Sequence, residues 1–121
     1  MFENDYIMRI IRDMVRFLAR AFLGKDTVDY ELPDEENYTQ TDFLHKQLLE
    51  LIEQGRINEA EDILFNEWEP GNERFMELAL DFYERLNNLD DEFLEKCDFS
   101  RGEIEQGLKD ITAKSGIKIP I

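Results

Sequence analysis

Residues 5–25 read DYIMRIIRDMVRFLARAFLGK, and this stretch decides the fold. It has no proline, no glycine before Gly24, and only Ile and Val among the β-branched residues, so it predicts a helix over 5–23. With residues placed about 100° apart, the apolar ones cover a wider face than an ordinary surface helix needs. We therefore expect a core helix that is covered by neighbours on more than one side.

Four arginines mark the opposite side of this helix. Arg9, Arg12, Arg16 and Arg20 fall within an arc of roughly 100°, which also holds Asp13. We call the four arginines the arginine stripe, and they are the candidate partner-binding residues. Three interpretations stay open: the solvated side of a central bundle helix, a helix shared across a homodimer interface, and a basic amphipathic helix at a membrane surface.

The charge of the chain is uneven. The net charge is −15 over 121 residues, but residues 1–25 carry five basic and three acidic groups, whereas residues 26–121 carry nine basic and 26 acidic groups. The acidic body excludes nucleic-acid binding, and it would be repelled by an anionic membrane. Because 42% of the residues are hydrophobic, the charge does not indicate disorder. The length fits one domain, and the charge favours a basic partner, of which the first helix is the nearest example.

Compartment follows from what the sequence lacks. Cys97 is the single cysteine, so no internal disulfide is expected and a reducing cytoplasm is the natural location. The arginine stripe interrupts the apolar run too often for a transmembrane segment. Glu3 and Asp5 stand where a secretory leader would be basic. We expect a cytoplasmic protein for which peripheral membrane contact is disfavoured.

An acidic connection, residues 24–41, follows the first helix. Gly24 is placed to end that helix, and Pro33 and six acids mark the stretch as a connection. The apolar side chains within it predict an ordered segment that wraps against the bundle; they are Val28, Tyr30, Leu32 and Tyr38.

The body, residues 42–121, has the signals of further helices, five or six in all with the first. Helices are expected up to Gln54, Pro70, Asn88, Cys97 and Gly116. Their predicted caps, in order, are Thr41 or Asp42, Asn58 with Glu61, Asn72, Asp90, and Ser100 with Glu103. The apolar residues of the final segment, Ile117, Ile119 and Ile121, are expected to pack onto the bundle. The sequence therefore predicts a single all-α domain over 1–121, built around helices 5–23 and 72–88.

Catalytic and metal-binding patterns are sparse. A Cys-His pair would need Cys97 to meet His45, and no Asn or Asp is placed by the sequence to orient the ring. One Asp42-x-x-His45 spacing lacks the second histidine of a di-iron bundle. The acidic clusters 34–36 and 90–92 lack the spacing of an EF-hand loop. We predict no catalytic residue, no cofactor and no metal site.

Two resemblances bear on the fold. Residues 53–64, EQGRINEAEDIL, resemble the turn of a tetratricopeptide helical hairpin, which would extend over 41–70. Leu48 and Glu67 depart from that motif, which prefers small residues there. The whole chain, from MFENDYIMRIIRDMVR to GRINEAEDIL, also resembles a family of small acidic all-helical bacterial proteins. That family has no assigned activity, so the resemblance implies fold class and compartment and no functional residue.

Three function classes remain after these exclusions. The sequence favours a non-enzymatic protein-interaction module, with self-association as one form of it. The alternative is a membrane-peripheral or adaptor protein that acts through the basic first helix. An unrecognised hydrolase or metal-dependent enzyme comes third.

Overall fold

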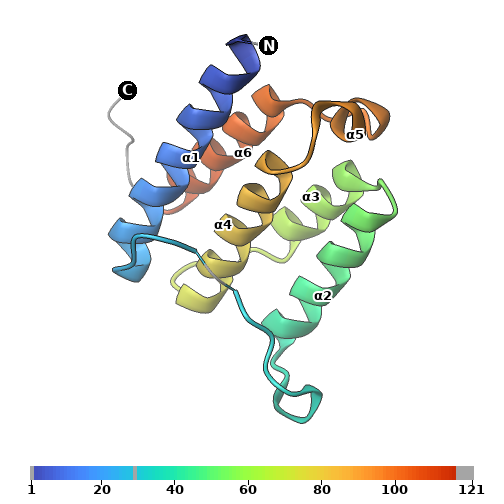
Figure 1. Ribbon diagram of the computed structural model, residues 1–121. Coiled ribbons are helices and arrows are strands. Elements are labelled where there is room, and N and C mark those ends of the chain that lie inside the picture. The colour runs from blue at the N-terminus through green and yellow to red at the C-terminus, as the bar shows by residue number, and fades with distance from the viewer. Residues whose placement is uncertain (1, 29, 117–121) are drawn as a thin grey trace.

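The chain folds into helices throughout the part that the structure, a computed structural model, describes: residues 2–28 and 30–116 (Figure 1). There is no strand within these residues, so the predicted all-α fold is confirmed. The elements are α1 (Phe2–Leu23), the 3₁₀ turn η1 (Glu35–Asn37), α2 (Gln40–Glu53), α3 (Ile57–Asn66), α4 (Glu73–Asn87), α5 (Asp91–Lys96) and α6 (Arg101–Lys114).

Helix α4 lies at the centre of one apolar core. It contacts α1, α2 and α6, and α1 in turn packs on α4 and α6. Side chains on several sides of α4 are therefore buried, with Leu78, Leu80 and Leu86 fully so. In α1, Ile11 and Leu18 are also fully buried. Both helices that the sequence assigned to the core belong to it.

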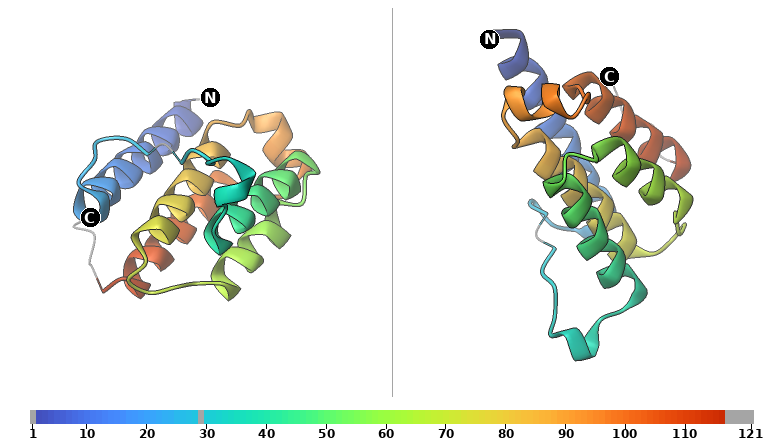
Figure 2. Two further views of the ribbon diagram at one scale, coloured as in Figure 1. Left: turned by 90° about the horizontal axis from the view of Figure 1, so that it is seen from below. Right: turned by 90° about the vertical axis from the view of Figure 1, so that its right-hand side faces the viewer.

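Helices α1 and α2 lie on opposite sides of α4 (Figures 1 and 2). Each packs one face on the bundle and leaves the other face to solvent. The acidic connection crosses from the end of α1 to the start of α2, as both figures show. Val28 and Tyr30 are buried, so this part of the connection is an ordered wrap, as predicted.

Two predicted helix starts are wrong. Helix α2 begins at Gln40, because Thr39 forms a capping box with Asp42, so the acidic connection ends two residues before the expected Thr41. Helix α3 begins at Ile57 with Arg56 as its N-cap, without a capping hydrogen bond from that side chain. Asn58 was expected to cap this helix, but it lies inside it and donates to the carbonyl oxygen of Asp98 at 3.2 Å.

Two other boundaries also moved. Helix α1 begins at Phe2, three residues before the predicted start. Helix α3 ends at Asn66, so the predicted end at Pro70 is wrong, and Trp68 lies beyond the helix. Trp68 instead packs edge-on against Phe75 at the start of α4.

The remaining caps are confirmed. The side chains of Asn72, Asp90 and Ser100 each accept a hydrogen bond from a backbone N–H in the first turn of the following helix. Glu103 completes the capping box of α6, and Gly24 ends α1 with a φ of +66°. The packing predicted for Ile117, Ile119 and Ile121 lies outside the described residues.

Within residues 2–28 and 30–116, no helix combines the length and the apolar character that crossing a bilayer requires.

Candidate functional site

The arginine stripe lies on the solvent side of α1. Arg9, Arg12, Arg16 and Arg20 are all exposed. Arg20 Nε donates to Asp26 Oδ1 at 2.6 Å, and both side chains remain mostly exposed. Among the described residues, no carboxylate lies within 4.0 Å of the other three guanidinium groups. The connection thus supplies an acid to one end of the stripe only.

Two aromatic side chains lie beside the stripe. Tyr6 is 65% exposed and Phe17 is 39% exposed, so neither is absorbed by the core. Each is followed three residues later by an arginine, Arg9 or Arg20, which is a neighbour on the helix surface. We call the stripe together with Tyr6 and Phe17 the α1 outer face.

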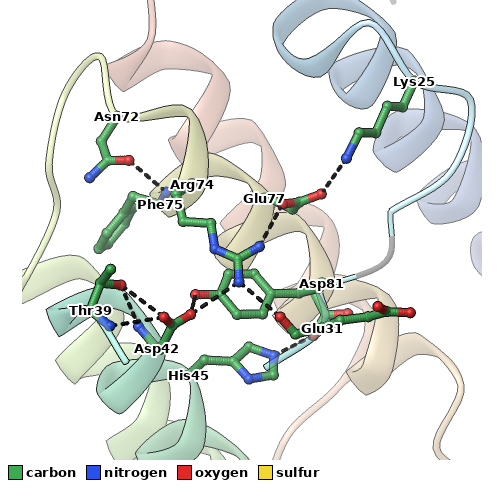
Figure 3. A network of polar contacts seen from close by, with 11 residues as sticks. Lys25, Glu31, Thr39, Asp42, His45, Asn72, Arg74, Phe75, Glu77 and Asp81 are labelled. Atoms are coloured by element: carbon green, nitrogen blue, oxygen red, sulfur yellow. Dashed lines mark hydrogen bonds and ion pairs between the residues drawn. The ribbon is translucent and has the colours of Figure 1, made fainter. Parts of the chain in front are cut away.

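A second feature, which the sequence did not reveal, is a buried cluster of charges between α2, α4 and the connection (Figure 3). Each of its three carboxylates is paired with a basic side chain that is itself partly exposed. The ion pairs are Asp42 with Arg74, Glu77 with Arg74 and Lys25, and Asp81 with Arg85. Three positive groups, whose side chains are 37% to 56% exposed, therefore balance three buried negative ones.

Asp42 is the most highly coordinated member of the cluster. One carboxylate oxygen accepts hydrogen bonds from the Tyr30 hydroxyl at 2.6 Å and from Arg74 at 3.0 Å. The other accepts from the backbone N–H of Thr39 at 2.9 Å. Burial by itself raises the pKa of Asp42, but these hydrogen bonds outweigh it and lower the pKa to about 2. Asp42 therefore stays ionised at every physiological pH.

Tyr30 joins the connection to both helices. Its ring stacks on His45 of α2, with ring centroids 4.2 Å apart, and Cζ of Arg74 of α4 lies 3.6 Å from the Tyr30 ring centroid. Burial and the hydrogen bond to Asp42 raise the pKa of Tyr30 well above its usual range. Arg74 also donates to the carbonyl oxygen of Glu31 at 2.9 Å. The aromatic contacts and these hydrogen bonds hold the connection against the bundle.

His45 is oriented by a carboxylate, contrary to the sequence prediction. Its Nε2 lies 2.9 Å from Asp81 Oδ2, which also accepts from Arg85 Nε at 2.6 Å. The ring is 3% exposed and lies under Tyr30, so solvent does not reach the pair in this arrangement. The Asp81 carboxylate therefore fixes the orientation of the His45 ring, and both side chains are buried.

Cys97 lies far from His45. An added Cβ at Gly55 would be 3.5 Å from the Cys97 sulfur, and Gly55 follows the end of α2. His45 is ten residues earlier in the sequence, which is about 15 Å along a helix. Burial raises the pKa of the Cys97 thiol, so it stays protonated at neutral pH. The two residues of the Cys-His hypothesis are not brought together.

The carboxylates of the buried cluster are balanced by basic side chains of the same chain. Asp42 and Glu77 both face Arg74, whose guanidinium occupies the space between them. No group of three or more His, Cys, Asp or Glu side chains that could hold a metal ion occurs in the described residues. The acidic stretches 34–36 and 90–92 are exposed and serve as helix starts.

An open groove lies where the start of α2 meets the segment between α3 and α4. Its volume is about 310 Å³. Phe43 at its edge is 59% exposed. We call it the α2 groove. It is lined by apolar side chains, two carboxylates and other polar side chains, which together are Gln40, Thr41, Phe43, Leu44, Gln47, Glu67, Glu69 and Phe75.

The sequence contained one signal of the buried cluster that was not used: two acidic residues on an apolar face of α4. Glu77 and Asp81 are four residues apart on α4 and point to the same side among buried neighbours. Such residues are rarely buried without a partner. Their spacing could have predicted buried ion pairs, although not which basic residues would form them.

Comparison with known proteins places the chain in a family. The match extends over residues 1–116 and is to a family of unknown function, DUF6483. No curated protein and no solved structure gives a match. The likeness of residues 41–70 to a tetratricopeptide hairpin stays a prediction, because the matching family description does not mention that motif. The chain therefore belongs to DUF6483, a family of unknown function.

Proposed function

We propose that this chain is a non-enzymatic protein-interaction module that binds its partner through the α1 outer face. One observation carries the proposal: four exposed arginines and two exposed aromatic side chains lie on one helix of a chain whose net charge is −15. Arginine, tyrosine and phenylalanine are enriched in protein interfaces, and arginine and tyrosine often dominate their binding energy. This composition, gathered on one helix, supports the binding of another protein at this face.

The charge pattern defines the partner. A basic surface attracts an acidic one and steers its approach, whereas the acidic remainder of the chain repels it. The partner therefore presents carboxylates together with an apolar feature that receives Tyr6 or Phe17. A lone buried cysteine fits a reducing compartment, so we place this interaction in the cytoplasm.

An anionic membrane is the second candidate. Basic and aromatic residues on one helix are also typical of interfacial membrane helices, and Tyr6 and Phe17 are exposed enough to enter one. The 26 acidic and nine basic residues of positions 26–121 oppose such contact. Co-sedimentation with phosphatidylserine vesicles, compared with phosphatidylcholine vesicles, separates the candidates, because a protein partner predicts no binding to either.

Affinity capture from the source cells tests the proposal. Arg9, Arg12, Arg16 and Arg20 are all changed to Ser, and a matched control changes four exposed acids to Ser: Glu36, Glu50, Glu53 and Glu92. We expect a partner that the wild type and the acidic control retain and that the arginine variant loses. Unchanged capture by a folded arginine variant, with the helical circular dichroism of the wild type, would contradict the proposal.

A further inference from the structure

The described chain leaves three large hydrophobic side chains exposed, and they fall on two surfaces. Tyr6 and Phe17 belong to the α1 outer face, and Phe43 stands at the edge of the α2 groove. An exposed aromatic side chain costs free energy unless something covers it. Both surfaces would be covered if the first surface of one copy of the chain packed on the second surface of another copy.

We propose that the partner of the α1 outer face is the α2 groove of a second copy of the chain. This inference rests on the proposed function, since it names the partner of the same surface. The protein then associates head to tail, with the α1 outer face of one copy against the α2 groove of the next.

Charge complementarity supports this pairing. The side of α1 that holds the four arginines also carries one acid, Asp13, and is therefore net basic. The groove is lined by Glu67 and by Glu69, whose side chain accepts a hydrogen bond from Asn72. Arg20 is held by Asp26 through an exposed ion pair, which is weak enough to be exchanged for a contact with another molecule. The basic face of one copy would meet the acidic groove of the next. Repulsion between the acidic surfaces elsewhere would disfavour other pairings of the two copies.

The apolar parts of the two surfaces are also complementary. Phe17 lies one turn before Arg20 and one turn after Asp13 on the helix surface, so an aromatic ring with one guanidinium group beside it lies at the edge of the α1 outer face. The groove has an apolar floor at Phe75, which is 2% exposed, and acids on one wall. Entry of the Phe17 ring into the groove would bring Arg20 towards those acids.

The positions of the two surfaces dictate the kind of assembly. Helices α1 and α2 lie on opposite sides of α4, and the arginines and Phe17 of α1 are exposed, so a copy does not cover its own stripe with its own groove (Figures 1 and 2). Contact between two different patches is heterologous, and it produces rings where the rotation closes and open chains where it does not. A contact between one helix face and one open groove is expected to be small, so the association should be weak and should depend on concentration and salt.

Sedimentation velocity of the full chain over a range of concentrations tests the inference. We expect the wild type to associate at up to about 0.5 mM protein, in the range of weak transient contacts, and to dissociate in about 1 M NaCl, where the screening length is only about 3 Å. A wild type that stays monomeric throughout this range at low salt would overturn the inference.

Two variants then locate the contact. The first reverses the stripe (Arg9→Glu, Arg12→Glu and Arg16→Glu), and the second alters the groove (Glu67→Lys and Phe43→Ser). Each should weaken self-association by about tenfold or more, because each loses a surface that carries both charge and apolar contact. Glu53→Lys, at the far end of α2, makes the same charge change as Glu67→Lys outside the groove and should leave association unchanged.

Mixing the two variants gives the sharpest result. The stripe variant keeps an intact groove and the groove variant keeps an intact α1 outer face, so the mixture should form a 1:1 complex that neither variant forms alone. Absence of this complex, although the wild type associates, would overturn the pairing. If the wild type is monomeric while arginine-dependent capture of another protein persists, the proposed function survives and the self-association does not.

Discussion

At the scale of single residues, Asp42 shows how a buried charge is tolerated. Its side chain is 3% exposed, yet hydrogen bonds from Tyr30, Thr39 and Arg74 fill the positions that water would occupy. An ion pair of this kind contributes little compared with apolar packing, but loss of one partner leaves the other charge buried and unpaired.

Substitution of Asp42 by Asn should therefore destabilise the protein. Asn is close in shape to the protonated acid, so the loss follows from the change in pKa from 3.8 to about 2, which corresponds to about 2 kcal/mol at neutral pH. Urea denaturation measures it. Glu36→Gln removes an exposed acid of η1 and should change the free energy of unfolding by less than about 0.5 kcal/mol. Equal effects of the two substitutions would contradict the role of Asp42.

The same residue predicts the acid response. The pKa of Asp42 is lower in the folded chain than in the unfolded one, so the unfolded state takes up the proton first and stability falls as the pH falls. The contribution of Asp42 is complete above about pH 5 and is lost towards about pH 2. Asp42→Asn should flatten the stability profile in this window, and an unchanged profile would assign acid sensitivity to other groups.

Substitution of Gly107 tests how tightly the side chain of Tyr83 is packed against α6. A Cβ at this position would overlap the hydroxyl of Tyr83, which is fully buried and donates to Glu61 Oε2 at 2.6 Å. Gly107→Ala should therefore destabilise by about 1–3 kcal/mol, even though alanine favours a helix. In the control Gly102→Ala, the nearest atom is the Ser100 hydroxyl at 3.7 Å, so we expect unchanged or higher stability. A stabilised Gly107→Ala would show that Tyr83 can move at little cost.

At the scale of elements, local signals were read correctly and contacts between distant segments were not. Ser100 and Glu103, Asn72 and Gly24 mark helix ends through groups a few residues apart, so the sequence alone identified them. Thr39 was missed as the cap of α2 because its box is closed by Asp42, where the usual motif has Glu or Gln.

The ion pairs of the buried cluster could not be predicted from local sequence patterns. Arg74 meets Asp42 from 32 residues away and His45 meets Asp81 from 36 residues away. No spacing rule connects residues on different helices before the fold is known. The arginine stripe could be found because its members share one helix, and the α2 groove could not because three segments build it.

Removal of the Tyr30 ring should loosen the connection between α1 and α2. Tyr30→Ala removes the stack on His45, the contact with Arg74 and the hydrogen bond to Asp42, at a cost of about 3–5 kcal/mol for a buried aromatic residue. Tyr38→Ala, whose ring packs on exposed Phe43, should cost less. Limited proteolysis within residues 24–39 should accelerate for Tyr30→Ala, and equal cleavage rates for both variants would show that Tyr30 does not hold the segment.

At the scale of the whole molecule, charge divides the chain into an acidic body and one basic face. Helix α1 uses its apolar side to complete the core with α4 and α6 and keeps its arginines in solvent. Because these arginines are exposed, their loss should affect stability little, which allows binding to be tested without unfolding. The central claim is that this face is where the chain meets another protein.

In-cell photo-crosslinking tests that claim most directly. A photoreactive phenylalanine analogue replaces Phe17 in one variant and Glu92, an exposed residue of α5, in another. We predict a crosslinked product of defined mass at position 17 that disappears when Arg9, Arg12 and Arg16 are changed to Ser, and none at position 92. Absence of a product at position 17, or an equal product at position 92, would contradict the account.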